Sequence, residues 1–188
     1  MSAHLAAADL ETLREVATIA IHRAVSEWRT WRPDPDDYPA QLRAPGAAFV
    51  TLRRNGRLRG CIGTLDFDEP LVACVAARAR AAALHDPRFQ AVKRDELDDL
   101  TVEISVLTEP EPMNVDSYED LLQSLRPGVD GVIVEADRHR ATLLPAVWDD
   151  EPSAATFIAA LWRKAGLRPG AWPAGIRVER YAAQKWPV

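Results

Sequence analysis

The sequence predicts an α+β fold, with a mainly antiparallel sheet and helices packed on it. Apolar and polar residues alternate in paired segments around short turns, helical patterns stand between these hairpins, and no internal repeat is present. With 188 residues, 47% of them apolar, the chain can bury a sizeable core. We expect a single domain over residues 1–188, or two closely fused lobes.

The first element is a helix that Asp9 can cap. Its apolar residues recur near a 3.6-residue period as far as Trp28, which predicts one face packed on the sheet. The next segment, about residues 32–46, contains four prolines, which fix backbone angles and remove N–H donors. It is therefore expected to be a loop, either a functional lid or a plain connector.

A hairpin is predicted around Asn55-Gly56, a dipeptide suited to the positive φ angles of a two-residue type I′ turn. With these two residues as the loop, Arg54 pairs with Arg57. Regular pairing then places Cys61 opposite Val50, and the other face pairs residue 49 with residue 62. The register thus predicts Cys61 on the same face as the preceding arginine of its strand.

Two glycines, Gly60 and Gly63, flank Cys61 in this strand. Glycine is costly in a strand interior unless a bulge, a bend or another molecule needs bare main chain there. The remaining elements are expected in the following order: a helix over 71–84 that ends near His85, a strand over 101–107, a helix over 117–125, a hairpin over 131–145, a helix over 153–167 and a strand over 176–183.

The composition excludes several classes of protein. The formal net charge of −5 argues against a surface built to neutralise phosphates, so nucleic acid is not expected as a partner. No apolar run approaches the roughly 18 residues of a membrane helix, and residues 1–13 lack the pattern of a secretory signal, so we expect a cytoplasmic protein. Two cysteines without metal-ligand spacing predict neither a metal site nor a disulfide framework. The abundant arginine and alanine are typical of a GC-rich bacterial genome.

Several motifs together resemble one family. They are FVTLRRNGRLRGCIGTL from residue 49, the DPRF of residues 86–89, the EISVL of 103–107, the LLP of 143–145 and the KAGL of 164–167. In this order they resemble the AMMECR family, and the LRGCIG core is specific to it. The resemblance covers most of the chain from residue 49 to residue 167.

The resemblance implies an α+β domain that occurs alone or beside Memo-like and radical-SAM proteins, as system protein A of the AmmeMemoRadiSam set. It fixes the fold more firmly than the reaction, and the cofactor stays unknown. The sequence departs from the family pattern at Ala146, where a glutamine is usual, and at Gln90-Ala91, where prolines are usual. A role that needs the glutamine side chain is weakened here.

Cys61 is the first candidate for chemistry. A cysteine is nucleophilic as its thiolate, which nearby positive charge and partial exposure favour, and Arg57 and Arg59 on the predicted face can supply that charge. The alternative is a small buried residue that tolerates tight sheet packing. Cys74, within an apolar helix face, is interpreted as core. His85, next to Asp86, is the one candidate base, provided that the helix end folds back over the hairpin.

Two functions remain open on this basis. The first is a binding component for a small molecule or a protein, which presents a cleft around the LRGCIG segment and serves a Memo-like and radical-SAM associated system. The second is an enzyme with Cys61 as nucleophile or redox thiol. The candidate ligand-binding residues are Arg57, Arg59, Gly60, Ile62, Gly63 and Arg88. An alternative to ligand binding by Arg88 is that the segment Asp86 to Phe89 fastens the end of a helix, with Arg88 in an ion pair. The six tryptophans are interpreted as core residues and terminal anchors.

Overall fold

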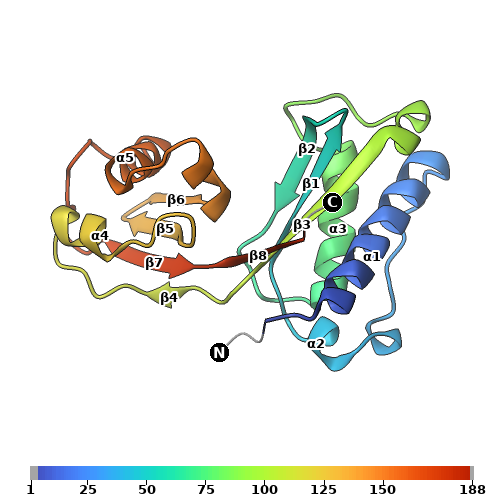
Figure 1. Cartoon of the computed structure of the whole chain (residues 1–188), viewed down its shortest axis with the longest axis horizontal. Coiled ribbons are helices and arrows are strands. Elements are labelled where there is room, and N and C mark those ends of the chain that lie inside the picture. Colours follow the sequence, from blue (N-terminus) through green and yellow to red (C-terminus); the bar gives the residue numbers. More distant parts are fainter. Residues whose placement is uncertain (1–3, 187–188) are drawn as a thin grey trace. The chain divides into compact units, whose positions relative to one another are not determined.

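The computed structural model describes residues 4–186, which form two compact units (Figure 1). Within the described residues, the first unit comprises 4–109 and 184–186, and the second comprises Pro110–Ala183. Each unit contains one four-stranded sheet, and the α+β fold with antiparallel pairing is confirmed. The single domain over residues 1–188 stays a prediction, because two compact units need not fold separately.

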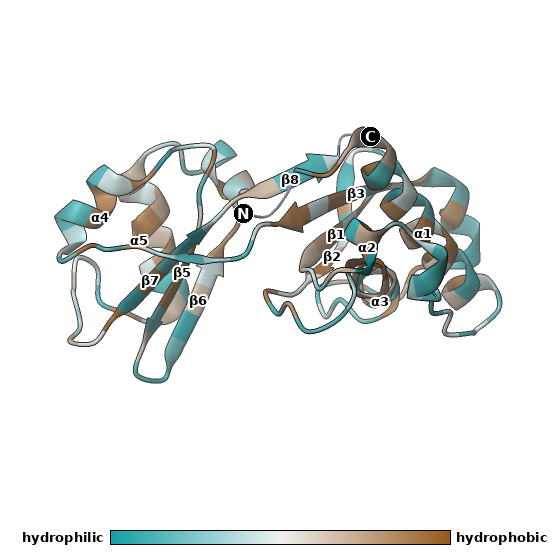
Figure 2. Ribbon diagram, turned by 90° about the horizontal axis from the view of Figure 1, so that it is seen from below, coloured by the Kyte–Doolittle hydropathy of each residue, from teal (hydrophilic) through white to brown (hydrophobic). Residues whose placement is uncertain are grey.

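The sheet of the first unit has the strand order β2-β1-β3-β8, so β2 is an edge strand. Its helices pack on one face, as the shared core of this unit shows. Figure 2 shows α3 as largely hydrophobic, whereas α1 carries hydrophilic residues on its outer side. The elements of this unit are α1 (Ala7–Ser26), α2 (Ala40–Arg43), β1 (Ala48–Arg54), β2 (Arg57–Gly63), α3 (Leu71–Leu84), β3 (Leu100–Leu107) and β8 (Ala183–Trp186), with 3₁₀ turns at Pro35–Asp37 and Arg94–Asp99.

The core of the first unit follows the predicted periodicities. Val102, Ile104 and Val106 of β3 are buried, as their alternation predicts, and Val50 and Leu52 of β1 are fully buried against the helices. The predicted start of α1 needs a correction: Asp9 lies inside the helix and accepts from the N–H of residue 6, so it caps from the third position. The segment 32–46 is an ordered connection, in which residues 35–37 and 40–43 form short helical turns.

The end of α1 also differs from the prediction. Trp28 lies beyond the helix, is 89% exposed and has a φ of 56°, so it is neither core nor anchor. The interpretation of all six tryptophans as buried is therefore wrong at this position. The other extreme is Trp162, which is fully buried in the second unit.

The hairpin forms at the predicted turn, and its register changes within four residues. Asn55 and Gly56 have φ angles of 51° and 74°, as a type I′ turn requires, and residue 54 pairs with residue 57. Arg59 is then an extra residue, because Leu52 pairs with Gly60 while residue 53 pairs with residue 58. This bulge shifts every later pair by one position. Cys61 lies opposite Thr51, so the predicted pairing with Val50 is wrong.

Packing explains both glycines beside Cys61. A Cβ on Gly60 would lie 2.3 Å from the main-chain oxygen of Ala82 in α3, so the helix approaches β2 as closely as bare main chain allows. A Cβ on Gly63 would lie 2.2 Å from the ring of Phe49, which covers the glycine from the neighbouring strand. The two glycines are therefore required by close contacts within the protein.

The second unit has the strand order β4-β7-β5-β6. The side-chain hydroxyls of Ser117 and Ser153 cap its two helices, and Gly166, with a φ of 73°, ends the second one. Phe157, at full burial, stacks on Trp148. The elements are β4 (Glu111–Pro112), α4 (Tyr118–Ser124), β5 (Gly131–Ala136), β6 (His139–Leu143), a 3₁₀ turn at Pro145–Asp149, α5 (Ala154–Ala165) and β7 (Arg177–Tyr181).

Candidate functional site

Cys61 lies in the edge strand β2, on the sheet face opposite to the helices. Its partner Thr51 alternates along β1 with Val50 and Leu52, whose side chains are buried against the helices. The Thr51 hydroxyl donates a hydrogen bond to Cys61 Sγ at 3.3 Å. Because Cys61 is only partly buried, its thiol and the neighbouring hydroxyl lie near the surface.

The main chain of Cys61 is held by two side chains rather than by another strand. Its N–H donates to Asp86 Oδ2 at 2.8 Å, and its carbonyl accepts from Arg88 Nη2 at 3.1 Å. Both groups therefore point away from β1, which makes Cys61 and Thr51 a non-hydrogen-bonded pair, the kind in which facing side chains come closest. We call the Asp86 and Arg88 side chains and the Cys61 main chain the edge clamp.

The edge clamp is an ion pair with many hydrogen bonds. Arg88 donates to Asp86 through Nε at 2.9 Å and through Nη2 at 2.7 Å, and the Arg88 main-chain N–H donates to Oδ1 at 3.1 Å. The Asp86 side chain is almost fully buried, whereas that of Arg88 is half exposed. A buried carboxylate is tolerated only when it is paired and hydrogen-bonded in this way.

The environment keeps Asp86 ionised. The Arg88 guanidinium, together with the main-chain N–H groups of Cys61 and Arg88, holds the pKa of the Asp86 carboxyl well below its usual range, although burial acts in the opposite direction. The pKa of Arg88 is raised, most strongly by Asp86, with a further contribution from the Cys61 side chain. The cation beside the thiol is therefore Arg88, and Asp86 is a poor proton acceptor.

Arg59, predicted to lie beside Cys61, is directed elsewhere by the bulge. Its Nε donates to Glu96 Oε1 at 2.9 Å, and its Nη atoms donate to the carbonyls of Gln90 and Ala91. Hydrogen bonding to Arg59 and to the Lys93 main-chain N–H lowers the pKa of Glu96 to about 2. The predicted placement of Arg59 one pair from Cys61 on a shared face is thus wrong.

The other predicted residues divide into two groups. Arg57, at the hairpin tip, is exposed and forms no ion pair within residues 4–186, so it is free to meet a ligand. The side chain of Ile62 packs against the hydrophobic core. Gly60 lies against the main chain of Ala82 and Gly63 against the ring of Phe49, so both glycines are covered by other residues of the chain. His85 follows the last residue of α3 and is exposed, and no hydrogen bond joins its side chain to Cys61 among the described residues. The structure therefore shows no hydrogen-bonded dyad of Cys61 and His85.

Cys74 is buried, as predicted. Burial raises the pKa of its thiol to about 11, which keeps it protonated at neutral pH. Among residues 4–186, no three or more His, Cys, Asp or Glu side chains gather in a way that could hold a metal ion. Within the same range, no helix has the length and apolar character needed to cross a membrane.

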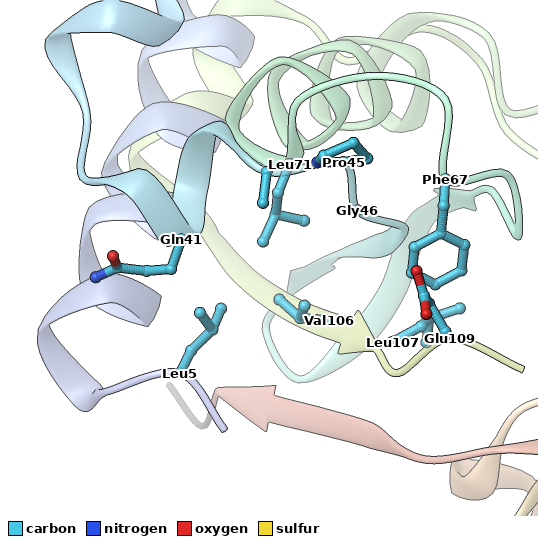
Figure 3. Close-up of a pocket in the computed structure, with 10 residues that line it drawn as sticks. Leu5, Gln41, Pro45, Gly46, Phe67, Leu71, Val106, Leu107 and Glu109 are labelled. Carbon is cyan, nitrogen blue, oxygen red and sulfur yellow. The ribbon is translucent and has the colours of Figure 1, made fainter. Parts of the chain in front are cut away.

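A hollow of about 410 Å³ lies elsewhere in the first unit (Figure 3). Phe67, Leu107 and Glu109 lie at one end of it, and Leu5 and Gln41 lie at the other. The Gln41 amide donates to Asp9 and is already engaged. None of the candidate residues predicted from the sequence lines this hollow.

The comparisons with known proteins agree with the fold. The AMMECR1 family matches residues 14–186. The chain belongs to the AMMECR1 family. Its structure is similar to the crystal structure of PH0010 from Pyrococcus horikoshii, with a TM-score of 0.85 and 34% identity over 94% of this chain and 89% of that one.

Two further relatives of this AMMECR1 chain are archaeal proteins. One, from Methanothermobacter thermautotrophicus, is 42% identical over 92% of this chain and 91% of its own length. The other, from Thermofilum pendens, is 37% identical over 96% of this chain and 90% of its own length. The comparisons therefore do not support the bacterial origin predicted from the arginine and alanine content.

Two contacts of the candidate site in this AMMECR1 chain cannot be read from its sequence. Asp86 follows the end of α3, and its contact with the strand 25 residues earlier has no local signal. The pairing of Cys61 with Thr51 depends on the bulge, which regular pairing does not predict. The glycine at position 60 was the one available sign of a bulge.

The edge clamp predicts a pH-dependent stability. We expect Asp86→Asn to lower the free energy of unfolding at pH 7 by about 2 to 3 kcal/mol, because Arg88 loses its charged partner and the Cys61 N–H a strong acceptor. Folding lowers the pKa of Asp86, so its contribution is present at neutral pH and is lost as the pH falls below about 4.

Urea unfolding between pH 7 and pH 3 measures this effect. The difference in the free energy of unfolding between wild type and Asp86→Asn should be largest at pH 7 and decrease towards pH 3. The exposed Asp68→Asn should have the same free energy of unfolding as wild type at pH 7 and at pH 3. A gap for Asp86→Asn that stays constant over this range contradicts the assignment.

Proposed function

We propose that the chain is a binding component that recognises a small molecule or a protein through the surface around Cys61 in the LRGCIG segment. One observation carries the proposal. Asp86 and Arg88 fix the main chain of Cys61, while the thiol and the Thr51 hydroxyl remain near the surface. A surface that is rigid before binding loses little conformational entropy when a ligand arrives.

The half-exposed guanidinium indicates the chemistry of the ligand. Within residues 4–186, the hydrogen bonds of Arg88 use Nε and Nη2, and Nη1 is left to bind an outside acceptor. A carbonyl or carboxylate oxygen suits this place, since the N–H groups of a guanidinium bind such acceptors strongly.

Binding is favoured over catalysis because the thiol lacks partners for chemistry. No hydrogen bond joins His85 to Cys61 within the described residues, and the lowered pKa of Asp86 makes it a poor base. The positive charge of Arg88 is balanced by Asp86, so little net charge is left to stabilise a thiolate.

The second candidate is an enzyme with Cys61 as nucleophile or redox thiol. The Thr51 hydroxyl donates to the sulfur, and the guanidinium of Arg88 interacts with the same side chain, which are two groups that favour a thiolate. This candidate also needs a general base, and the Cys61 sulfur is hydrogen-bonded to the hydroxyl of Thr51. The binding hypothesis needs no base.

The partners follow from the family resemblance rather than from the coordinates. We propose Memo-like and radical-SAM proteins as the partners of this chain, with the Cys61 surface as the contact.

Binding to purified Memo-like and radical-SAM proteins of the same organism tests the partner. We expect micromolar binding by biolayer interferometry and at least a tenfold loss in Cys61→Ala and in Thr51→Val, because both remove surface groups and leave the clamp in place. Leu58→Ala, which changes an exposed residue nearer the turn of the same strand, is the matched control. Equal affinity in all variants, or no binding to either protein, speaks against the proposed surface.

Alkylation by iodoacetamide at pH 7 separates binding from catalysis. In a Cys74→Ala background, intact-mass analysis should show Cys61 reacting no faster than free glutathione, since neither a base nor net positive charge activates it. Modification at ten times the glutathione rate or more would favour the enzyme. The Arg88→Gln variant then shows whether the guanidinium causes the acceleration.

A further inference from the structure

A second cavity of the first unit lies at the end of α1, and no residue of the edge clamp lines it. Its volume is about 490 Å³, within the range of roughly 300 to 1,000 Å³ that is usual for sites of small molecules. Most of its lining is apolar. The residues that line it are Ala24, Val25, Ser26, Trp28, Leu84 and the segment Gln90 to Arg94.

Trp28 has two unusual properties. It is 89% exposed, so its indole gains almost nothing from burial in the protein. Its φ of 56° lies in the left-handed region, at the position after a helix C-cap where glycine is usual. The N–H of Arg29 donates to the Arg23 carbonyl across this position, so the helix end accounts for the turn, and the exposed indole is left as the feature without a partner among the described residues.

The charges of the lining are all positive. Lys93 and Arg94 are its ionisable side chains, and no carboxylate lines the cavity. Both are exposed, and neither forms an ion pair within the described part of the chain. The cavity therefore combines an apolar body with an edge that attracts an anion.

The wall of this cavity is fixed by the LRGCIG strand. Arg59 donates to the carbonyls of Gln90 and Ala91, at 2.9 and 3.4 Å, and the N–H of Val92 donates to Ala83 in α3 at 2.8 Å. These bonds hold the segment that carries Lys93 and Arg94 in place. A ligand would thus meet a wall that is already ordered.

We propose that this cavity binds a small molecule with a flat, aromatic or other apolar body and an anionic group. The indole of Trp28 stacks on the body, the apolar lining covers its other side, and Lys93 and Arg94 pair with the anion. This site is separate from the surface around Cys61, and the proposal does not depend on the function proposed for that surface.

Two fluorescent probes test the proposal on the full chain. The first is 8-anilinonaphthalene-1-sulfonate, an aromatic anion, and the second is N-phenyl-1-naphthylamine, its uncharged counterpart. We expect saturable binding of the sulfonate at one site per chain and weaker binding of the amine. A Lys93→Gln/Arg94→Gln double variant should lose at least fivefold in affinity for the sulfonate and keep its affinity for the amine.

The Trp28→Gly variant separates a binding role from a structural one. It removes the indole and relieves the left-handed backbone, so the melting temperature should stay the same or rise while both probes bind at least tenfold more weakly. Arg138→Gln and Val129→Ala, both exposed positions of the second unit, are matched controls for charge and apolar area. Sulfonate affinities within twofold of wild type in Trp28→Gly and in the double variant, or a lower melting temperature of Trp28→Gly, overturn the proposal.

Discussion

The first unit depends on how its edge strand is closed at Cys61. An edge strand presents unpaired N–H and C=O groups, which invite pairing with other chains. Here the carboxylate of Asp86 accepts the N–H and the guanidinium of Arg88 donates to the carbonyl, as a neighbouring strand would do. Because the two side chains also bind each other, the chain closes its edge with a single ion pair.

The clamp and the bulge act together on the same strand. Arg59, the extra residue, is held by Glu96 and by two carbonyls of the segment that follows Arg88. The segment 86–96 therefore contacts β2 at two points, one on each side of Gly60. The close approach of α3 at Gly60 fixes the distance between β2 and this helix. These three contacts leave the Cys61 main chain little freedom, and they leave its side chain near the surface.

Local signals predicted the elements and failed at the contacts between them. The turn at Asn55-Gly56, the alternation in β3 and the bounds of α3 are encoded within a few neighbouring residues, and the structure has them as expected. The register beyond Leu52 depends on a bulge that distant residues stabilise, so regular pairing gave the wrong partner for Cys61. The two-residue strand β4 and the edge strand β8 carry too few residues for a pattern.

The candidate site shows the same division. The two glycines near Cys61 are unusual in a strand and mark it as a candidate, yet both serve packing. The sequence predicts the cation beside the thiol on the same strand, whereas it lies on a segment 27 residues further on. Trp28 continues the apolar period of α1, and periodicity cannot show that the helix has already ended.

Amide hydrogen exchange at Cys61, followed by NMR under native conditions, tests the edge clamp most directly. The clamp predicts slow exchange of the Cys61 N–H, comparable with the interior strand β1, although Cys61 lies in an edge strand. In Asp86→Ala the Cys61 amide should exchange much faster. The exchange rates of the β1 amides should rise only as much as the overall loss of stability requires. Fast exchange at Cys61 in the wild-type protein would contradict the central claim.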